Sequence, residues 1–116
     1  MRLEPQIHDE VCILRLKGRF ATGSDAEFVS AQKYLQEAGV AKAVVDFKEV
    51  PYIDSTGLAF VVDLHKSLVN RGGQVFLAGA NARVREVLRM TRIGEIIPLF
   101  DDVEEAEAAL RGEVLC

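Results

Sequence analysis

Apolar residues along the chain recur with two periods, that of a β-strand and that of an α-helix. The first of these segments have the period of a strand. One such segment alternates, with Leu14 and Leu16 on one face and Arg15 on the other, which is typical of a half-buried strand. Residues 43–47 are almost continuously apolar, as in a strand that is covered on both faces. Strands are predicted at residues 3–7, 11–17, 43–47, 75–78 and 96–100.

Between these segments, apolar residues recur at helical spacing. The second helical segment follows Asp54-Ser55-Thr56-Gly57, and its apolar positions are Leu58, Val61, Val62, Leu68 and Val69. Gly39 and Gly72 follow the first two helical segments, and glycine commonly ends a helix. Helices are predicted from residue 24 or 25 to 38, from 55 to 70, from about 81 onward, and from 101 to 110.

Strands therefore alternate with helices after an initial hairpin at residues 3–17. This order predicts an α/β domain whose later strands are largely parallel and are joined by helical crossovers. Pro98 lacks a backbone N–H, which confines the last strand to an edge or a bulge. Because 116 residues is near the commonest domain size, we expect one domain over residues 1–116.

Composition and charge narrow the class of protein. The chain is 49% apolar and 28% charged, the proportions of an ordinary soluble globular protein. Its formal net charge of −4 argues against a dedicated nucleic-acid binder. No apolar run is long enough to span a bilayer, and no secretory signal opens the chain. Neither a membrane nor a nucleic acid is therefore expected as a partner.

The two cysteines, Cys12 and Cys116, are far apart in the sequence. A disulfide framework is therefore not expected, and a reducing cytoplasm is the predicted location. Cys12 alternates with Leu14 and Leu16, and we interpret it as a small core residue.

The candidate chemistry lies in the segment Tyr52-Ile53-Asp54-Ser55-Thr56-Gly57-Leu58. It joins a strand to a helix, so Ser55 is expected at the carboxyl edge of the sheet, where sites gather in open α/β folds. With Ser55 as the N-cap, its hydroxyl oxygen would accept a hydrogen bond from an N–H of the first turn. The remaining N–H groups would be available to a phosphoryl group on Ser55. Gly57 has no side chain and would let a partner come close.

Other interpretations of Ser55 are weighed against this one. A serine at a helix start is among the commonest capping arrangements, so the tetrapeptide alone leaves a purely structural role open. A hydrolase nucleophile is disfavoured, because His65 lies ten residues along the same helix, roughly 15 Å away at the normal rise. Ile53 stands where the Gly-x-Ser-x-Gly motif has its first glycine, and His8 has no position that the sequence fixes relative to Ser55.

No other catalytic or ligand-binding motif is recognisable in the sequence. Phosphate-binding glycine loops are absent, and Gly72-Gly73 is interpreted as a helix stop. Histidines, cysteines and carboxylates show no metal-ligand spacing, so neither a metal nor a cofactor is expected. His65 lies on the apolar face of its helix and is interpreted as half-buried and hydrogen-bonded. We therefore expect a protein that is acted upon, with no catalytic residues, and not an enzyme.

At this point the residues match a family. Asp54-Ser55-Thr56-Gly57-Leu58 after an apolar strand resembles the signature of the STAS domain (sulfate transporter and anti-sigma factor antagonist). The resemblance continues through residues 72–73, 75–78, 81–85 and 97–106, and it covers nearly the whole chain from Val11 to Leu110. It implies the STAS fold, a mixed sheet of four to five strands flanked by about four helices. It also implies a stand-alone anti-sigma factor antagonist that regulates bacterial transcription.

The resemblance further implies a phosphorylation switch. Unphosphorylated, the chain would bind an anti-sigma factor that is also a serine kinase and so release a sigma factor. Phosphorylation would break that complex, and a phosphatase would restore it. The family's phosphoacceptor directly follows the aspartate, so it falls on Ser55 and not on Thr56. The partner-binding residues that the resemblance implies are Asp54, Ser55, Thr56, Gly57, Phe20 and Thr22.

The loop that contains Phe20 departs from the family. Members often carry Gly-Glu-(Leu or Ile)-Asp there, whereas this chain has Gly18-Arg19-Phe20-Ala21-Thr22, which lacks both acids. In the family this loop lies near the serine and contributes to the partner surface, so the identity of the partner stays open. One alternative is a STAS subunit of a larger assembly, such as a lipid-transport complex or a stress-sensing scaffold. The other is a module that binds a small ligand or a nucleotide.

Four arginines crowd the third predicted helix: Arg83, Arg85, Arg89 and Arg92. The last three share one helical face at spacings i, i+4 and i+7. We interpret them as a solvated outer face with Glu86 as a local partner, and a docking surface is the alternative.

Overall fold

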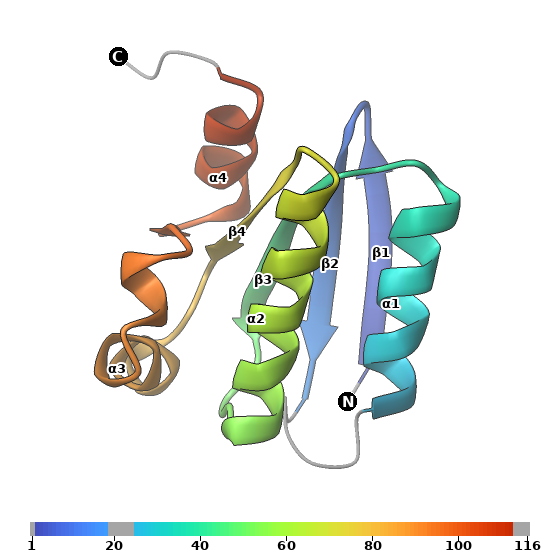
Figure 1. The fold of residues 1–116 in the computed structure, drawn as a ribbon. Coiled ribbons are helices and arrows are strands. Elements are labelled where there is room, and N and C mark those ends of the chain that lie inside the picture. Colours follow the sequence, from blue (N-terminus) through green and yellow to red (C-terminus); the bar gives the residue numbers. More distant parts are fainter. Residues whose placement is uncertain (1, 19–24, 113–116) are drawn as a thin grey trace.

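The computed structural model describes residues 2–18 and 25–112. They form a five-stranded sheet with helices on both faces (Figure 1). In chain order the elements are β1 (Arg2–His8), β2 (Val11–Lys17), α1 (Asp25–Glu37), β3 (Lys42–Glu49), α2 (Ser55–Asn70), β4 (Gln74–Ala78), α3 (Ala82–Met90), the 3-10 helix η1 (Ile93–Glu95), β5 (Leu99–Phe100) and α4 (Val103–Leu110). The predicted α/β class and the predicted numbers of strands and helices are confirmed.

The strands lie in the order β1-β2-β3-β4-β5, so each strand pairs with the next one along the chain. β1 and β2 form the predicted antiparallel hairpin, and the other three pairs are parallel. The carboxyl ends of β2, β3, β4 and β5 therefore share one edge of the sheet. The connections from β3 to α2 and from β4 to α3 both start at this edge.

The main core lies between the sheet and two helices, α1 and α2, which lie side by side over one face (Figure 1). Alternation in β2 turns Cys12, Leu14 and Leu16 toward these helices, and all three are fully buried. Phe28 of α1 stacks on Phe60 of α2 with ring centroids 4.2 Å apart. The predicted core role of Cys12 is confirmed.

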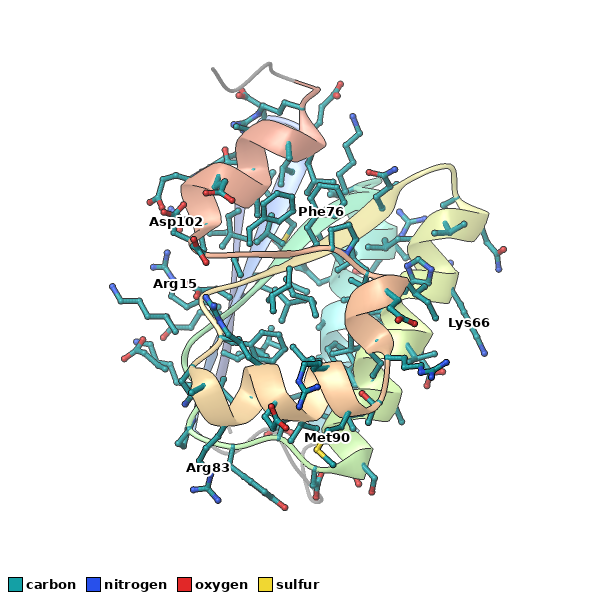
Figure 2. The ribbon with its side chains drawn as sticks, turned by 90° about the vertical axis from the view of Figure 1, so that its left-hand side faces the viewer. Arg15, Lys66, Phe76, Arg83, Met90 and Asp102 are labelled. Carbon is teal, nitrogen blue, oxygen red and sulfur yellow. The ribbon has the colours of Figure 1, made fainter. Side chains whose placement is uncertain are left out.

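A smaller core lies on the opposite face, under α4. Val11, Ile13 and Val44 project there from β2 and β3 and pack with Ala106 and Leu110 of α4. Figure 2 shows an aromatic side chain of β4 beside α4, and it packs against this cluster. Helix α4 is eight residues long, and charged side chains line a cavity beside its first turn.

The turn between α2 and β4 depends on two glycines. Gly72 has a φ of +79°, a conformation that residues with a Cβ rarely adopt. A Cβ on Gly73 would overlap the carbonyl oxygen of Ala41, so this position accepts no larger residue without a shift of the backbone. The predicted helix stop at these glycines is confirmed.

Two details differ from the expectations. The predicted strand at 96–100 is wrong except for β5, because α3 ends at Met90 and Arg92, whose φ is +62°, leads into η1. The carbonyl of Pro98 accepts a hydrogen bond from Leu77 N at 2.9 Å, but proline has no N–H to return, so pairing begins only after it. Val69, predicted to face inward, is 47% exposed.

Candidate functional site

Ser55 is the first residue of α2 and is exposed to solvent. The loop before it starts where β3 ends, and its apolar residues Val50 and Ile53 are 1% and 2% exposed. These two buried side chains fix the loop against the core, and they bring Ser55 to the carboxyl edge of the sheet. The predicted start of the helix and the predicted exposure of Ser55 are confirmed.

The N-cap of α2 is Asp54, so the expectation that Ser55 caps this helix is wrong. Asp54 has an extended backbone (φ −112°, ψ −171°), and its Oδ1 accepts hydrogen bonds from Thr56 N at 2.9 Å and from Gly57 N at 3.1 Å. Aspartate and serine are similarly good caps, and here the cap lies one residue earlier than expected. The hydroxyl of Ser55 is therefore not needed for the cap.

Three N–H groups of the first turn are donors within the chain. Thr56 and Gly57 donate to the side chain of Asp54, and Leu58 N donates to its carbonyl oxygen at 3.0 Å. The expectation that these groups would receive a phosphoryl group on Ser55 is therefore wrong. Gly57 is also buried, so it does not form part of an exposed rim. The positive end of the helix dipole still favours a phosphate, and the adjacent carboxylate opposes it.

The end of β2 lies beside the end of β3 at the same edge. Gly18 N donates to the carbonyl oxygen of Glu49 at 3.0 Å. Phe20 and Thr22, the two predicted partner-binding residues after this point, lie outside the described residues. Their assignment stays a prediction.

The start of α3 also reaches the loop that precedes Ser55. Nδ2 of Asn81 donates to the carbonyl oxygens of Val50 at 3.3 Å and Pro51 at 3.4 Å. Asn81 is predicted only as the start of the third helix, and the preference of asparagine for the N-cap is the one signal that points to this residue. Its contact with the loop joins segments 31 residues apart and has no signature in the sequence.

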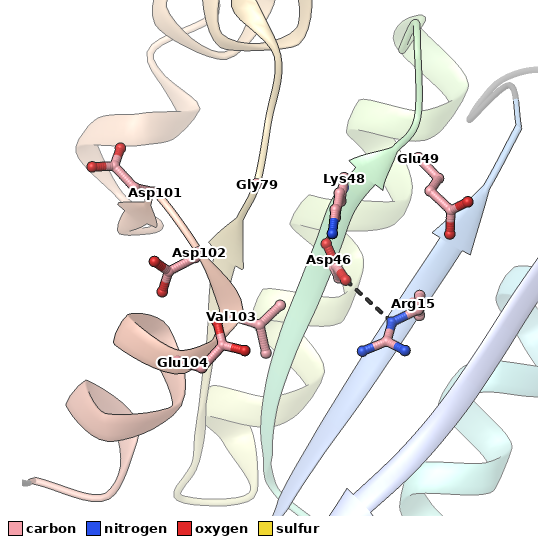
Figure 3. Close-up of a pocket in the computed structure, with 9 residues that line it drawn as sticks. All are labelled: Arg15, Asp46, Lys48, Glu49, Gly79, Asp101, Asp102, Val103 and Glu104. Atoms are coloured by element: carbon pink, nitrogen blue, oxygen red, sulfur yellow. Dashed lines mark hydrogen bonds and ion pairs between the residues drawn. The ribbon is translucent and has the colours of Figure 1, made fainter.

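A second polar site lies on the sheet face that α4 partly covers (Figure 3). Asp46 is 4% exposed; its Oδ2 accepts from Arg15 Nε at 3.3 Å, and its Oδ1 accepts from Lys48 N at 2.9 Å. A cavity of about 650 Å³ opens beside this pair, lined by two cationic side chains and five carboxylates. This acidic excess is unsuited to a ligand that carries phosphate groups. Ser55 does not line the cavity, so the two sites are separate.

Neither histidine lies where it could act as a base on Ser55. His8 pairs with Val11 at the amino edge of β2, the edge opposite Ser55, and its Nδ1 lies 3.6 Å from Glu107 Oε1. His65 is half-buried as expected, but its buried Nδ1 has no hydrogen-bond partner, so the expectation that it is hydrogen-bonded is wrong at that atom. Within residues 2–18 and 25–112, no group of three or more potential ligand side chains could hold a metal ion.

The arginines of α3 lie on its solvent side. Arg89 Nη2 pairs with Glu86 Oε1 at 2.5 Å, and this hydrogen bond lowers the pKa of Glu86 and raises that of Arg89. Arg85 donates to the carbonyl oxygen of Ala80 at 2.9 Å and pairs with Asp101 at 2.9 Å. The expected local pairing with Glu86 is confirmed, and Arg85 ties α3 to the segment before α4.

The fold and the site define a small α/β domain that presents a serine at the start of a helix, on the carboxyl edge of its sheet. Residues 2–106 match the STAS domain, and the chain belongs to this family. The predicted STAS fold is confirmed. No helix in the described part of the chain has the length and apolar character that crossing a bilayer requires.

Known proteins of similar sequence and structure carry a consistent description. The chain is 25% identical to the anti-sigma F factor antagonist of Paenibacillus polymyxa over 103 residues, 88% of each chain. It is 30% identical over 112 residues, 96% of each chain, to BtrV of Bordetella bronchiseptica, a candidate anti-sigma factor antagonist. The anti-sigma factor antagonist SpoIIAA in its unphosphorylated form superposes with a TM-score of 0.84 at 20% identity, covering 98% of this chain and 100% of that one. At that identity the likeness shows the fold alone.

Proposed function

We propose that the chain is an anti-sigma factor antagonist whose binding is switched by phosphorylation of Ser55. Unphosphorylated, it binds an anti-sigma factor that is also a serine kinase, and so frees a sigma factor; a phosphatase acting on phosphorylated Ser55 resets it. Support comes from two relatives described as anti-sigma factor antagonists, whose alignments cover 88% and 96% of the length of this chain. The observation that carries the proposal is the exposed Ser55 at the first position of α2, outside the cap.

Phosphorylation acts on binding more than on the fold. Because Asp54 holds the cap, a modified Ser55 leaves the start of α2 intact. A phosphate adds about −1.5 to −2 charges at neutral pH. The helix dipole favours a nearby charge by about 0.3–1 kcal/mol, and the carboxylate of Asp54 opposes it, so the free energy of unfolding changes little. Against a complementary partner surface, the same phosphate meets steric and like-charge penalties.

The proposed docking face is centred on the first turn of α2. Ser55 is exposed, and Asp54 and Thr56 beside it are half-buried. Gly57 is buried and is proposed to contribute only indirectly, because the absence of a side chain there adds no bulk beside Ser55.

Phe20 and Thr22 are proposed to extend the docking face from the loop after β2. Gly18, just before them, is hydrogen-bonded to the end of β3, so the loop begins at the edge that carries Ser55. An apolar Phe20 there would serve as an anchor. Calorimetry with the kinase should show a clear loss of affinity for Phe20→Ala, and unchanged affinity in a folded variant would remove this loop from the interface.

The protein is proposed to act as a single cytoplasmic domain over residues 1–116, as a regulator and not as an enzyme. The alternative of a nucleotide-binding module gains no support from the cavity beside Asp46, whose acidic lining repels phosphate groups. No observation favours the alternative of a subunit in a larger assembly.

The test is intact-protein mass spectrometry after incubation with ATP and the kinase-type anti-sigma factor from the same bacterium. The wild type should gain one phosphate and Ser55→Ala none, while the matched control Thr56→Ala should still gain one. Equal uptake by the wild type and Ser55→Ala would place the acceptor elsewhere, with Thr56 the first candidate.

A further inference from the structure

The carboxamide of Asn81 belongs to two structural elements at once. Its Oδ1 accepts from Val84 N at 2.9 Å and so caps α3. Its Nδ2 donates to the carbonyl oxygens of Val50 and Pro51, in the loop that leads to Ser55. One side chain therefore joins the start of α3 to the segment that presents the proposed phosphoacceptor.

The chemistry of the contacts fixes the orientation of this amide. A backbone N–H only donates and a carbonyl oxygen only accepts, so the oxygen of Asn81 must face Val84 and the nitrogen must face the loop. The two N–H groups of Nδ2 can serve one carbonyl each. The residue that carries one of these carbonyls, Val50, is 1% exposed, so losing its donor is costly.

Asn81 is itself held in place by α3. Its carbonyl oxygen accepts from Arg85 N at 2.9 Å, and the preceding carbonyl, of Ala80, accepts from Arg85 Nε at 2.9 Å. Val84 and Leu88 anchor the same helix in the main core. The Nδ2 donor of Asn81 therefore extends from a helix that is anchored in the core.

The loop, in contrast, has little regular structure of its own. Between β3 and α2 it contains neither a helix nor a strand, apart from a single bridge residue at Ile53. The turn bond from Val50 N to Phe47 O at 3.0 Å fixes only its first residue. Pro51, the next residue, is exposed and has no N–H to donate, and its carbonyl oxygen is held by Asn81.

We propose that Asn81 is the positioning residue of the Ser55 site: its carboxamide locks the loop of residues 50–54 to α3 and so holds Asp54 and Ser55 in the orientation that a partner reads. This inference deepens the proposed function and rests on it only for the identity of the partner. Rigid placement of a recognised segment lowers the entropic cost of binding. Without the hydrogen bonds from Asn81 to the loop, the cap that Asp54 forms on α2 opens more often.

Two substitutions separate the contact of Asn81 with the loop from its role as the cap of α3. Asn81→Ser keeps a capping oxygen for Val84 N but is too short to reach the loop. Asn81→Asp keeps the cap and the shape but turns an acceptor toward two carbonyl oxygens. A matched control is Asp102→Ala, which removes the cap of α4, where Oδ1 accepts from Glu105 N at 2.8 Å, and leaves the loop untouched.

The first experiment is hydrogen exchange by NMR on these variants, with no partner present. Both Asn81 variants should speed exchange of the Thr56 and Gly57 amides by about twofold to tenfold, the effect of losing one modest hydrogen bond. The Val84 amide should stay protected, because the cap is kept. Asp102→Ala should leave Thr56 and Gly57 unchanged. Unchanged exchange at these two amides in both Asn81 variants, or a uniform rise over the whole chain, overturns the proposal.

The second experiment measures phosphorylation kinetics with the kinase-type anti-sigma factor. Asn81→Ser should raise KM by about threefold or more with kcat little changed, because the loop must be ordered on binding, and Asp102→Ala should match the wild type. Equal KM values for the wild type and Asn81→Ser overturn the positioning role. If the wild type takes up no phosphate at all, the proposed function fails, and the exchange experiment alone decides the role of Asn81.

Discussion

Asp54 Oδ1 lies 2.9 Å from Thr56 N, and Ser55 stands between these two residues. The aspartate therefore completes the start of α2, while the serine beside it is left exposed. The cap and the proposed phosphoacceptor are therefore adjacent residues, and we expect a modification at Ser55 to leave the cap intact. This separation is compatible with a switch that changes binding without unfolding the domain.

Removing the cap should cost stability, and removing the serine should not. We expect Asp54→Ala to lower the free energy of unfolding by about 1 kcal/mol, within a range of about 0.5–2, because two first-turn N–H groups lose their acceptor. Asp54→Asn, which keeps a capping oxygen, should lose less. Ser55→Ala should stay within about 0.5 kcal/mol of the wild type, as an exposed substitution does. Urea denaturation measures all three, and a loss in Ser55→Ala equal to that in Asp54→Ala would show that the serine is the cap.

The ion pair between exposed Arg15 and buried Asp46 should matter for stability but not for the switch. Asp46→Ala leaves Lys48 N and Arg15 Nε without their acceptor, which should cost about 1–3 kcal/mol. Asp46→Asn keeps one acceptor oxygen and should cost less. Because this pair lies on the sheet face away from α1 and α2, Asp46→Asn should take up phosphate at Ser55 as the wild type does. Urea denaturation and mass spectrometry check the two claims, and a folded Asp46→Asn protein that resists phosphorylation would connect the two sites.

Two glycines make a matched pair for testing the turn before β4. Gly73→Ala should destabilise the protein by about 1–3 kcal/mol, since its Cβ overlaps Ala41 and the backbone must shift. Gly94→Ala meets no atom within 4 Å and should be close to neutral. Thermal unfolding of both variants decides the matter, and equal melting temperatures would mean that the close approach of Gly73 to Ala41 is not a constraint.

The sequence predicted what depends on periodicity and missed what depends on distant contacts. Alternation in β2 and the apolar run in β3 were sufficient for the sheet, and Gly72 marked the end of α2. Asp54 and Ser55 are both good caps, and only the backbone of a loop anchored by Ile53 and Asn81 decides between them. That anchoring, like the pair of Arg15 and Asp46, joins segments 31 residues apart, and no local pattern encodes it.

The Cys12 thiol should be inert in the folded protein. Burial raises its pKa to about 11, while a backbone hydrogen bond involving Gln6 lowers it by a smaller amount. The thiolate is thus scarce at pH 8, and a thiol reagent should label native Cys116→Ser protein, which retains only Cys12, no more than slowly. Labelling should become rapid in urea.

The same pKa shift sets a stability window for Cys12. Because the folded pKa is raised, the contribution of the protonated thiol is fully present below the unfolded pKa of 9.0 and is lost as pH rises toward about 11. Urea denaturation between pH 8 and 11 should show this loss in Cys116→Ser and a smaller one in Cys12→Ala/Cys116→Ser. Rapid labelling of native Cys116→Ser at pH 8 would show that Cys12 is accessible and ionised.

We expect one phosphate on Ser55 to control partner binding, and calorimetry on protein made with phosphoserine at position 55 measures this control. The titrant is the kinase-type anti-sigma factor without ATP, and circular dichroism confirms that both forms are folded. We expect the unphosphorylated chain to bind and the phosphorylated chain to bind at least about 100-fold more weakly, since a like-charge contact costs several kcal/mol. Ser55→Ala should bind as the unphosphorylated form does. Equal affinities for the phosphorylated and unphosphorylated chains would show that a phosphate on Ser55 does not control partner binding.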